Sequence, residues 1–203
     1  MNFHKSSIAA FALMQVAGSG SAGEAHLLAT NAPACIVLRD QYDAPQKLSF
    51  PTTNITVLTI ADRKGSDQVD GWIAALKLRY SGRIHLRGLA EVGSVPAFLR
   101  RKIRKRFQET RTYPVMMDWS GKVCARLGYQ PDLANILILG RDGSILGRFT
   151  GGAVETNRAA AFDALDKALL VQHPARNHRR ENHHRCESIN NRGSKRGRST
   201  ANV

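Results

Sequence analysis

The chain has 203 residues, with 30 lysine and arginine residues against 16 aspartate and glutamate residues, giving a formal net charge of +14. This length suits one ordinary domain with extensions and is short for two domains. Three cysteines lie far apart, at Cys35, Cys124 and Cys186. This spacing excludes a disulfide-rich framework and a cysteine zinc site. No apolar run reaches the length of a transmembrane helix.

The first 34 residues have two interpretations. Lys5 precedes a modestly apolar stretch that ends in small residues, which is typical of a weak signal peptide. Gln15 interrupts the apolar centre, and Glu24 stands awkwardly near any cleavage point. We therefore expect residues 1–34 to be either a signal peptide or a flexible extension. An exported or periplasmic location and a cytoplasmic one are equally compatible with this stretch.

Residues 54–91 predict a strand, a helix and a second strand. The segment 54–61 is a β-branched run with little polar alternation, which is typical of a strand covered on both faces. A polar loop follows, and Ser66 is the expected N-cap of a helix that ends at Ser81–Gly82. The segment 84–91 completes a βαβ unit, so the two strands should be parallel with a right-handed crossover. Apolar residues recur at helical spacing in between: Val69, Trp72, Ile73, Leu76 and Tyr80.

A second helix with a basic outer face is expected over residues 95–107. Its apolar residues recur at helical spacing, and Pro96 is tolerated in a first turn. A short strand over 115–118 and a short helix over 122–127 follow.

The end of the domain predicts a hairpin and a last helix. Residues 141–143, Arg-Asp-Gly, separate the apolar runs 135–140 and 144–150, and Asp-Gly between two apolar runs is a strong hairpin signal. Thr156 opens a helix that continues to Val171, where the apolar periodicity stops.

This order joins a parallel half to an antiparallel half. It favours a mixed α/β fold of the thioredoxin-like kind, a three-layer sandwich with a C-terminal antiparallel hairpin and a final helix, and leaves other α/β sandwiches open. We assign residues 35–171 to this domain. Residues 172–203 carry eight basic and two acidic side chains and little apolar surface, so we expect a basic disordered tail.

Two motifs carry a resemblance to a known family. Asp118 and Gly121 precede the short helix, which ends in Gly128–Tyr129, and the first hairpin strand runs into residues 141–143, Arg-Asp-Gly. With the segments 38–41 and 56–60, these motifs resemble the redoxin superfamily over residues 35–170. The resemblance is to peroxiredoxins of the alkyl hydroperoxide reductase and thiol-specific antioxidant type, and to membrane-tethered thiol-disulfide proteins. The stretch 59–66 also resembles the YtfJ branch, whose members lack the usual cysteines.

The chain departs from this family at the reactive position. The resemblance implies a cysteine at the start of the helix after the first core strand, where the helix N-terminus stabilises a thiolate. The resemblance also implies a proline directly before the hairpin strand, but Ala134–Asn135 stand there and Pro131 lies several residues earlier. We therefore expect a degenerate redox loop and an altered surface for docking a disulfide substrate. The loop has no cysteine and consists of Asp62, Arg63, Lys64, Gly65 and Ser66.

Three functions are compatible with these features. The first is a non-catalytic binding or accessory role with an unidentified protein partner. The second is an atypical thiol-disulfide or peroxide oxidoreductase working through Cys124 or Cys35, which could instead pair with each other if the protein is exported. The third is polyanion or nucleic-acid binding through the tail and a basic patch. The basic patch consists of Arg100, Arg101, Lys102, Arg104, Lys105 and Arg106.

Each candidate residue also has a simpler structural interpretation. Ser66 could replace the attacking cysteine, but capping the helix is favoured because no histidine stands nearby to activate its hydroxyl. Cys124 is more simply a small buried apolar residue. The loop 62–64 could hold an anion but is more simply solvated. The tail holds four histidines with Cys186 in no zinc-site spacing, so we predict no metal site and no cofactor. These tail residues are His173, His178, His183 and His184.

Overall fold

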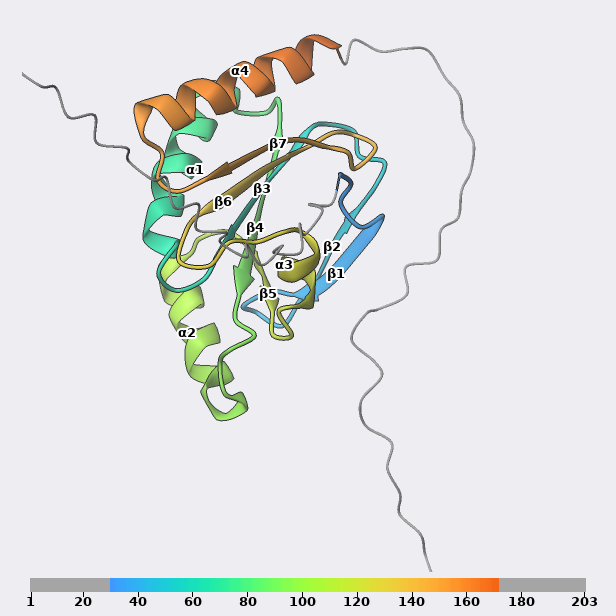
Figure 1. Cartoon of the computed structure of the whole chain (residues 1–203). Helices are drawn as coiled ribbons and strands as arrows, with labels where there is room; N and C mark the ends of the chain where they lie inside the picture. Colours follow the sequence, from blue (N-terminus) through green and yellow to red (C-terminus); the bar gives the residue numbers. More distant parts are fainter. Residues whose placement is uncertain (1–29, 172–203) are drawn as a thin grey trace, which may run out of the picture.

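The central layer of the protein is a five-stranded mixed sheet with the strand order β5-β4-β3-β6-β7 (Figure 1). The computed structural model describes residues 30–171. The three strands β3, β4 and β5 are parallel, while β6 pairs antiparallel with β3, and β7 pairs antiparallel with β6. A separate antiparallel pair, β1–β2, precedes the sheet. The strands are β1 (Cys35–Arg39), β2 (Pro45–Ser49), β3 (Thr56–Ala61), β4 (His85–Glu91), β5 (Val115–Asp118), β6 (Asn135–Leu139) and β7 (Ile145–Thr150).

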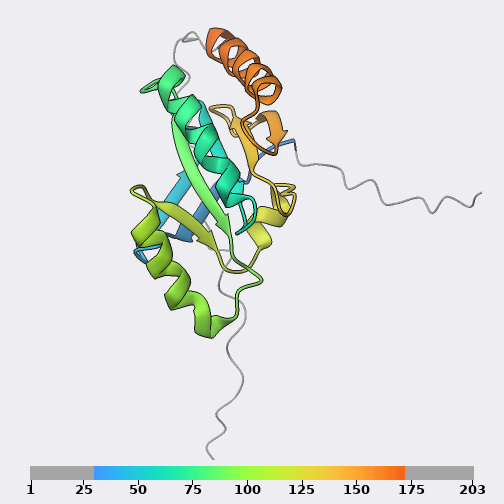
Figure 2. The ribbon, with the colours of Figure 1, turned by 90° about the vertical axis from the view of Figure 1, so that its left-hand side faces the viewer.

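Helices and the β1–β2 pair cover the two faces of the sheet. The helices are α1 (Ser66–Tyr80), α2 (Arg100–Thr110), α3 (Lys122–Arg126) and α4 (Glu155–Val171), with a 3-10 turn, η1 (Ala97–Leu99). One face carries α1, α4 and α2, and Figure 2 shows α1 and α2 in front of the sheet with the β1–β2 pair behind. The other face carries the β1–β2 pair and α3. This is the predicted three-layer α/β sandwich.

The middle of the sheet is buried because it has a layer on each side. All six residues of β3 are buried, and Trp72 of α1 is fully buried against one face of the sheet. Leu58 and Ile60 face the opposite cluster, which includes residues of β1, β2 and α3. The β-branched run without polar alternation therefore predicted the position of β3 correctly.

The edge strand β5 is covered by a side chain. Gln41 is fully buried, and its amide donates to the carbonyl of Tyr113 over 2.9 Å and accepts from the N–H of Val115 over 2.8 Å. Next to it, an isolated antiparallel β-bridge joins the backbones of Asp40 and Met116. The side chain of Gln41 thus takes the place of a neighbouring strand along the start of β5.

Two elements differ in detail from the sequence prediction. Pro96 has an extended ψ of 144°, so the helix expected from residue 95 forms only as η1 and then α2. The hairpin between β6 and β7 forms as predicted, but only Gly143 has a positive φ there, at 91°. Its loop is a three-residue turn, as expected for residues 141–143, and it ends in a left-handed glycine. Among residues 30–171, no helix is both long and apolar enough to span a bilayer.

Candidate functional site

The loop between β3 and α1 is organised by the carboxylate of Asp62. One carboxylate oxygen accepts the N–H of Gly65 over 2.7 Å, and the other accepts the N–H of Asp132 over 2.9 Å. Ser66 is the first residue of α1 rather than its cap, and its hydroxyl donates to the carbonyl of Arg63 over 2.8 Å. The prediction that Ser66 caps the helix is therefore wrong, because Asp62 already holds the turn from the preceding strand end.

The loop before β6 closes over the start of α1. Lys64 pairs with the carboxylate of Asp132 over 2.8 Å, and the side chain of Gln68 accepts the N–H of Ala134 over 3.2 Å. A Cβ atom added to Gly65 would lie 2.4 Å from the carbonyl oxygen of Leu133, so only glycine fits between the two segments. The two loops that frame the reactive position are in direct contact.

The backbone N–H and carbonyl groups of the segment before β6 also have hydrogen-bond partners. The side chain of Asn135 accepts the N–H of Gln130 over 2.8 Å and donates to the carbonyls of Gln130 and Leu133, each over 2.9 Å. In residues 30–171 the only cis peptide bond is Phe50–Pro51, so Pro131 follows a trans bond. The backbone groups beside Leu133 and Ala134, where the resemblance implies substrate docking, are therefore used within the chain.

Hydrogen bonds set the charge state of Asp62. Partial burial would raise the pKa of this carboxyl, but the backbone N–H groups of Gly65 and Asp132 outweigh it, so the pKa lies below its usual range. The hydroxyl of Tyr129 is buried beside the carboxylate without a regular hydrogen bond. Burial raises the pKa of Tyr129, and the negative charge of Asp62 raises it further. At neutral pH the side chain of Asp62 is therefore an ionised carboxylate held by hydrogen bonds, and the loop presents no reactive nucleophile.

Cys124 lies inside α3 and has no exposed surface. The buried carboxylate of Asp118 caps this short helix, because it accepts the N–H groups of Val123 over 2.8 Å and of Cys124 over 2.9 Å. Burial raises the pKa of the Cys124 thiol strongly, and the charges of Asp118 and Glu91 add to the shift. A thiol with a raised pKa holds little thiolate and reacts slowly.

The two candidate cysteines do not form a bond with each other. Cys124 is a free thiol inside the core, whereas Cys35 begins β1 and is half-buried. The Cys35–Cys124 disulfide that was an option from the sequence is therefore absent.

The structure divides the basic patch on α2 into two groups. The guanidinium groups of Arg100 and Arg104 lie 5.2 Å and 5.8 Å from the ring centre of Trp119, and Arg104 also pairs with Asp43 over 2.8 Å. These two residues therefore anchor α2 to the β5–α3 segment. The exposed members of the patch are Arg101, Lys102, Lys105 and Arg106.

Two aromatic side chains lie near the basic patch, although residues 100–106 contain no aromatic residue. The side chain of Phe98 precedes α2 and is 82% exposed. Trp119 comes from a different element, so no local sequence pattern could have placed it beside Arg100. The tail histidines and Cys186 lie outside the described residues, as do the predicted tail itself and residues 1–29.

Similarity to known proteins is confined to three-dimensional structure. No protein-family model matches the chain, and no curated protein matches its sequence. Among solved structures, a Chlorobium tepidum protein described as a thiol:disulfide interchange protein DsbE has a TM-score of 0.53 at 16% identity, covering 70% of this chain and 99% of that one. The pneumococcal exposed lipoprotein thioredoxin Etrx1 of Streptococcus pneumoniae has a TM-score of 0.53 at 14% identity, with 66% and 99% covered.

A third solved structure gives the same result. StoA of Bacillus subtilis has a TM-score of 0.50 at 12% identity, covering 66% of this chain and 98% of StoA. At these identities the similarity shows the fold. The thioredoxin-like fold predicted from the sequence is therefore confirmed, and the resemblance to the redoxin superfamily and its YtfJ branch stays a prediction.

Proposed function

We propose that this redoxin-fold chain has a non-catalytic binding or accessory role. The start of α1, where the resemblance implies a reactive cysteine, has no cysteine and contacts the segment before β6. The observation that carries the proposal is the contact between the β3–α1 loop and the segment before β6. Asp132 lies between Asp62 and Lys64 and bonds to both, while Gly65 packs on Leu133. A disulfide substrate that approaches from the side of the segment before β6 would have to break these bonds to reach the start of α1.

The surroundings of Cys124 argue against moving thiol chemistry to that residue. A nucleophilic thiol needs a thiolate and access to its substrate. Cys124 is fully buried, and negative side chains surround it instead of the positive groups that would favour the thiolate. An oxidoreductase that works through Cys124 is for this reason less supported than the binding role.

Assays of the purified full-length chain test the proposal. We expect no reduction of insulin disulfides and no peroxide consumption above the uncatalysed rates, with an active thioredoxin as the positive control. Turnover that is lost in a Cys124→Ser or Cys35→Ser variant would overturn the proposal and establish the oxidoreductase alternative.

A second candidate, polyanion binding, is favoured by the exposed half of the basic patch. Arg101, Lys102, Lys105 and Arg106 are exposed on α2, and Phe98 is exposed next to them. Each phosphate neutralised by such a side chain steepens the salt dependence of DNA binding by about one unit of log-log slope. Changing these four residues to glutamine should flatten that slope, and so should removing residues 172–203. Equal slopes in all three proteins would contradict this candidate.

A further inference from the structure

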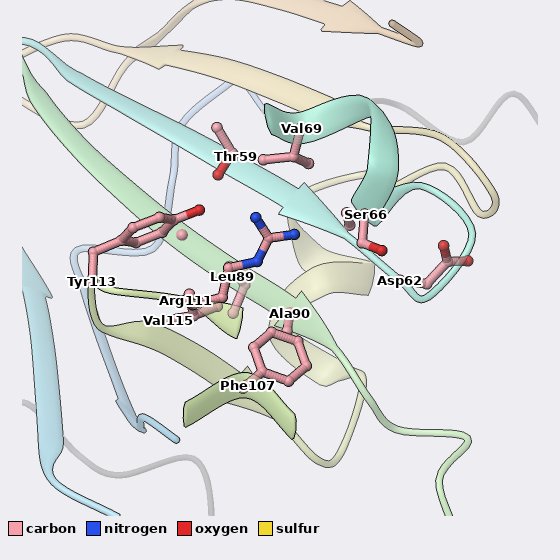
Figure 3. Close-up of a pocket in the computed structure, with 12 residues that line it drawn as sticks. Thr59, Asp62, Ser66, Val69, Leu89, Ala90, Phe107, Arg111, Tyr113 and Val115 are labelled. Carbon is pink, nitrogen blue, oxygen red and sulfur yellow. The ribbon is translucent and has the colours of Figure 1, made fainter. Parts of the chain in front are cut away.

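A pocket opens between α1 and α2 on the helix-covered face of the sheet (Figure 3). Its floor consists of two pairs of small residues that stand side by side on β3 and β4: Thr59 beside Gly88, and Ala61 beside Ala90. Because these side chains are short, the sheet leaves the space beneath the two helices unfilled. The empty space measures about 350 Å³, a figure that includes the open solvent at its mouth.

The walls of the pocket are mostly apolar. Val69 of α1, Phe107 of α2 and Val115 of β5 line it. Such walls favour a short hydrocarbon group over a fully polar ligand such as phosphate.

Arg111, directly after α2, supplies the cation of the pocket. Its side chain is only 18% exposed, and Figure 3 shows the guanidinium reaching into the space between Thr59, Val69 and Tyr113. The hydroxyl of Tyr113 interacts with this guanidinium, and Lys77 lies 5.5 Å from the centre of the Tyr113 ring. A guanidinium has five N–H donors in a planar fork that matches a carboxylate.

An internal carboxylate already bonds to this guanidinium. Asp70 of α1 pairs with Arg111 at the rim, and the side chain of Asp70 is 62% exposed. Water reaches the Asp70 side of this pair and screens it there, which weakens the pair. The other carboxylate at the mouth, Asp62, is held by the backbone N–H groups of Gly65 and Asp132.

We propose that this pocket binds a carboxylate carried on a short apolar group, with Arg111 as its anchor. Asp70 occupies the anchor when the ligand is absent, and the ligand carboxylate displaces it. The shared chemistry fits either a small free carboxylic acid or the carboxyl end of a peptide with an apolar last residue. The assignment deepens the binding role proposed above and rests on it.

Titration of the full-length chain with isobutyrate, followed by calorimetry or amide NMR shifts, tests the proposal. The uncharged isostere isobutyramide is the matched ligand control. We expect isobutyrate to bind and isobutyramide to bind at least about tenfold more weakly, because a charge-assisted pair is lost. The variant Arg111→Gln should weaken isobutyrate binding by about the same factor.

A gain-of-binding variant separates the proposal from a simple folding defect. Asp70→Asn removes the competing carboxylate and should tighten isobutyrate binding by about threefold. Asp67→Asn changes another exposed acid in the first turns of the same helix and should leave binding unchanged. Equal binding of isobutyramide, no effect of Arg111→Gln, or no binding to both the native chain and Asp70→Asn would overturn the proposal.

A peptide comparison identifies the source of the carboxylate. Gly-Gly-Val with a free carboxyl end should bind more tightly than isobutyrate if peptide ends are the ligand, and less tightly if small acids are. Turnover in the thiol assays would refute the proposed function without touching this result, since the titration depends on Arg111 alone.

Discussion

Two neighbouring regions of the helix-covered face use their polar side chains in opposite ways. At the start of α1, Asp62 and Gln68 bond to the backbone before β6, so the two segments are in contact and nothing can enter between them. In the gap between α1 and α2, small residues on the sheet leave space, and Arg111 bonds to an exposed aspartate. Contacts between the two loops therefore close one gap beside α1, whereas the gap between α1 and α2 leaves the guanidinium of Arg111 partly accessible.

The largest effect that could break this comparison concerns the reactivity of Cys124. In the native chain at pH 8 we expect Cys124 to react with iodoacetamide at least about 100-fold more slowly than in the unfolded chain, because it is buried and its pKa is raised. Peptide mapping by mass spectrometry resolves this cysteine from the other two. Equal rates in the two states would mean that the core around α3, on the opposite face of the sheet, is open in solution.

The tight contact at Gly65 gives the largest expected change in stability. Gly65→Ala places a methyl group against the carbonyl of Leu133 and should lower the free energy of unfolding by about 2 kcal/mol. Gly152→Ala is the matched control, since a Cβ there meets nothing within 4 Å and should change stability by less than about 0.5 kcal/mol. Urea denaturation followed by circular dichroism measures both, and equal midpoints would show that the loops are not in contact.

A smaller change sharpens the role of Asp62. Asp62→Asn keeps one acceptor oxygen and should cost about 1 kcal/mol at pH 7, because the N–H of Gly65 or of Asp132 loses its partner. The pKa of Asp62 is depressed in the folded state, so its stabilisation is complete above the unfolded pKa of about 4 and is lost as the pH falls through the folded value. The difference between the two proteins should therefore shrink below about pH 4. A difference that stays constant from pH 7 to pH 2 would contradict this assignment.

The smallest effect is expected at Lys64. Its ion pair with Asp132 is exposed on both sides, with 73% and 55% of the two side chains accessible. Lys64→Ala should leave the denaturation midpoint unchanged, because water screens such a pair. A clear loss of stability would mean that charge, and not the backbone contacts of Asp62 and Gly65, holds the two loops together.

The sequence predicted those helices and strands whose burial follows a local pattern of apolar residues. The spacing of Trp72 and Leu76 predicted α1, and the β-branched run predicted β3. Both predictions succeeded because burial of one or two faces of an element determines the spacing of its apolar residues. The strand β2 was missed because its sequence, Pro-Gln-Lys-Leu-Ser, has only one residue that the structure buries.

The candidate site was less predictable because its contacts join distant segments. The absence of cysteine from residues 62–66 was visible in the sequence, but the closing contacts come from Asp132 and Leu133, about 70 positions later. Arg111 gave no signal either, since its environment depends on small residues of β3 and β4. Only the pairing of Thr59 with Gly88 and of Ala61 with Ala90 across the sheet creates that space.

The side chain of Gln41 has a consequence for self-association. An edge strand with unpaired backbone groups invites the addition of a strand from another molecule, which leads to aggregation. Gln41 satisfies the backbone of Tyr113 and Val115 with one amide, so the edge at β5 offers no free template there. Replacing this single glutamine with leucine would leave both backbone groups without their hydrogen-bond partner at that edge of the sheet.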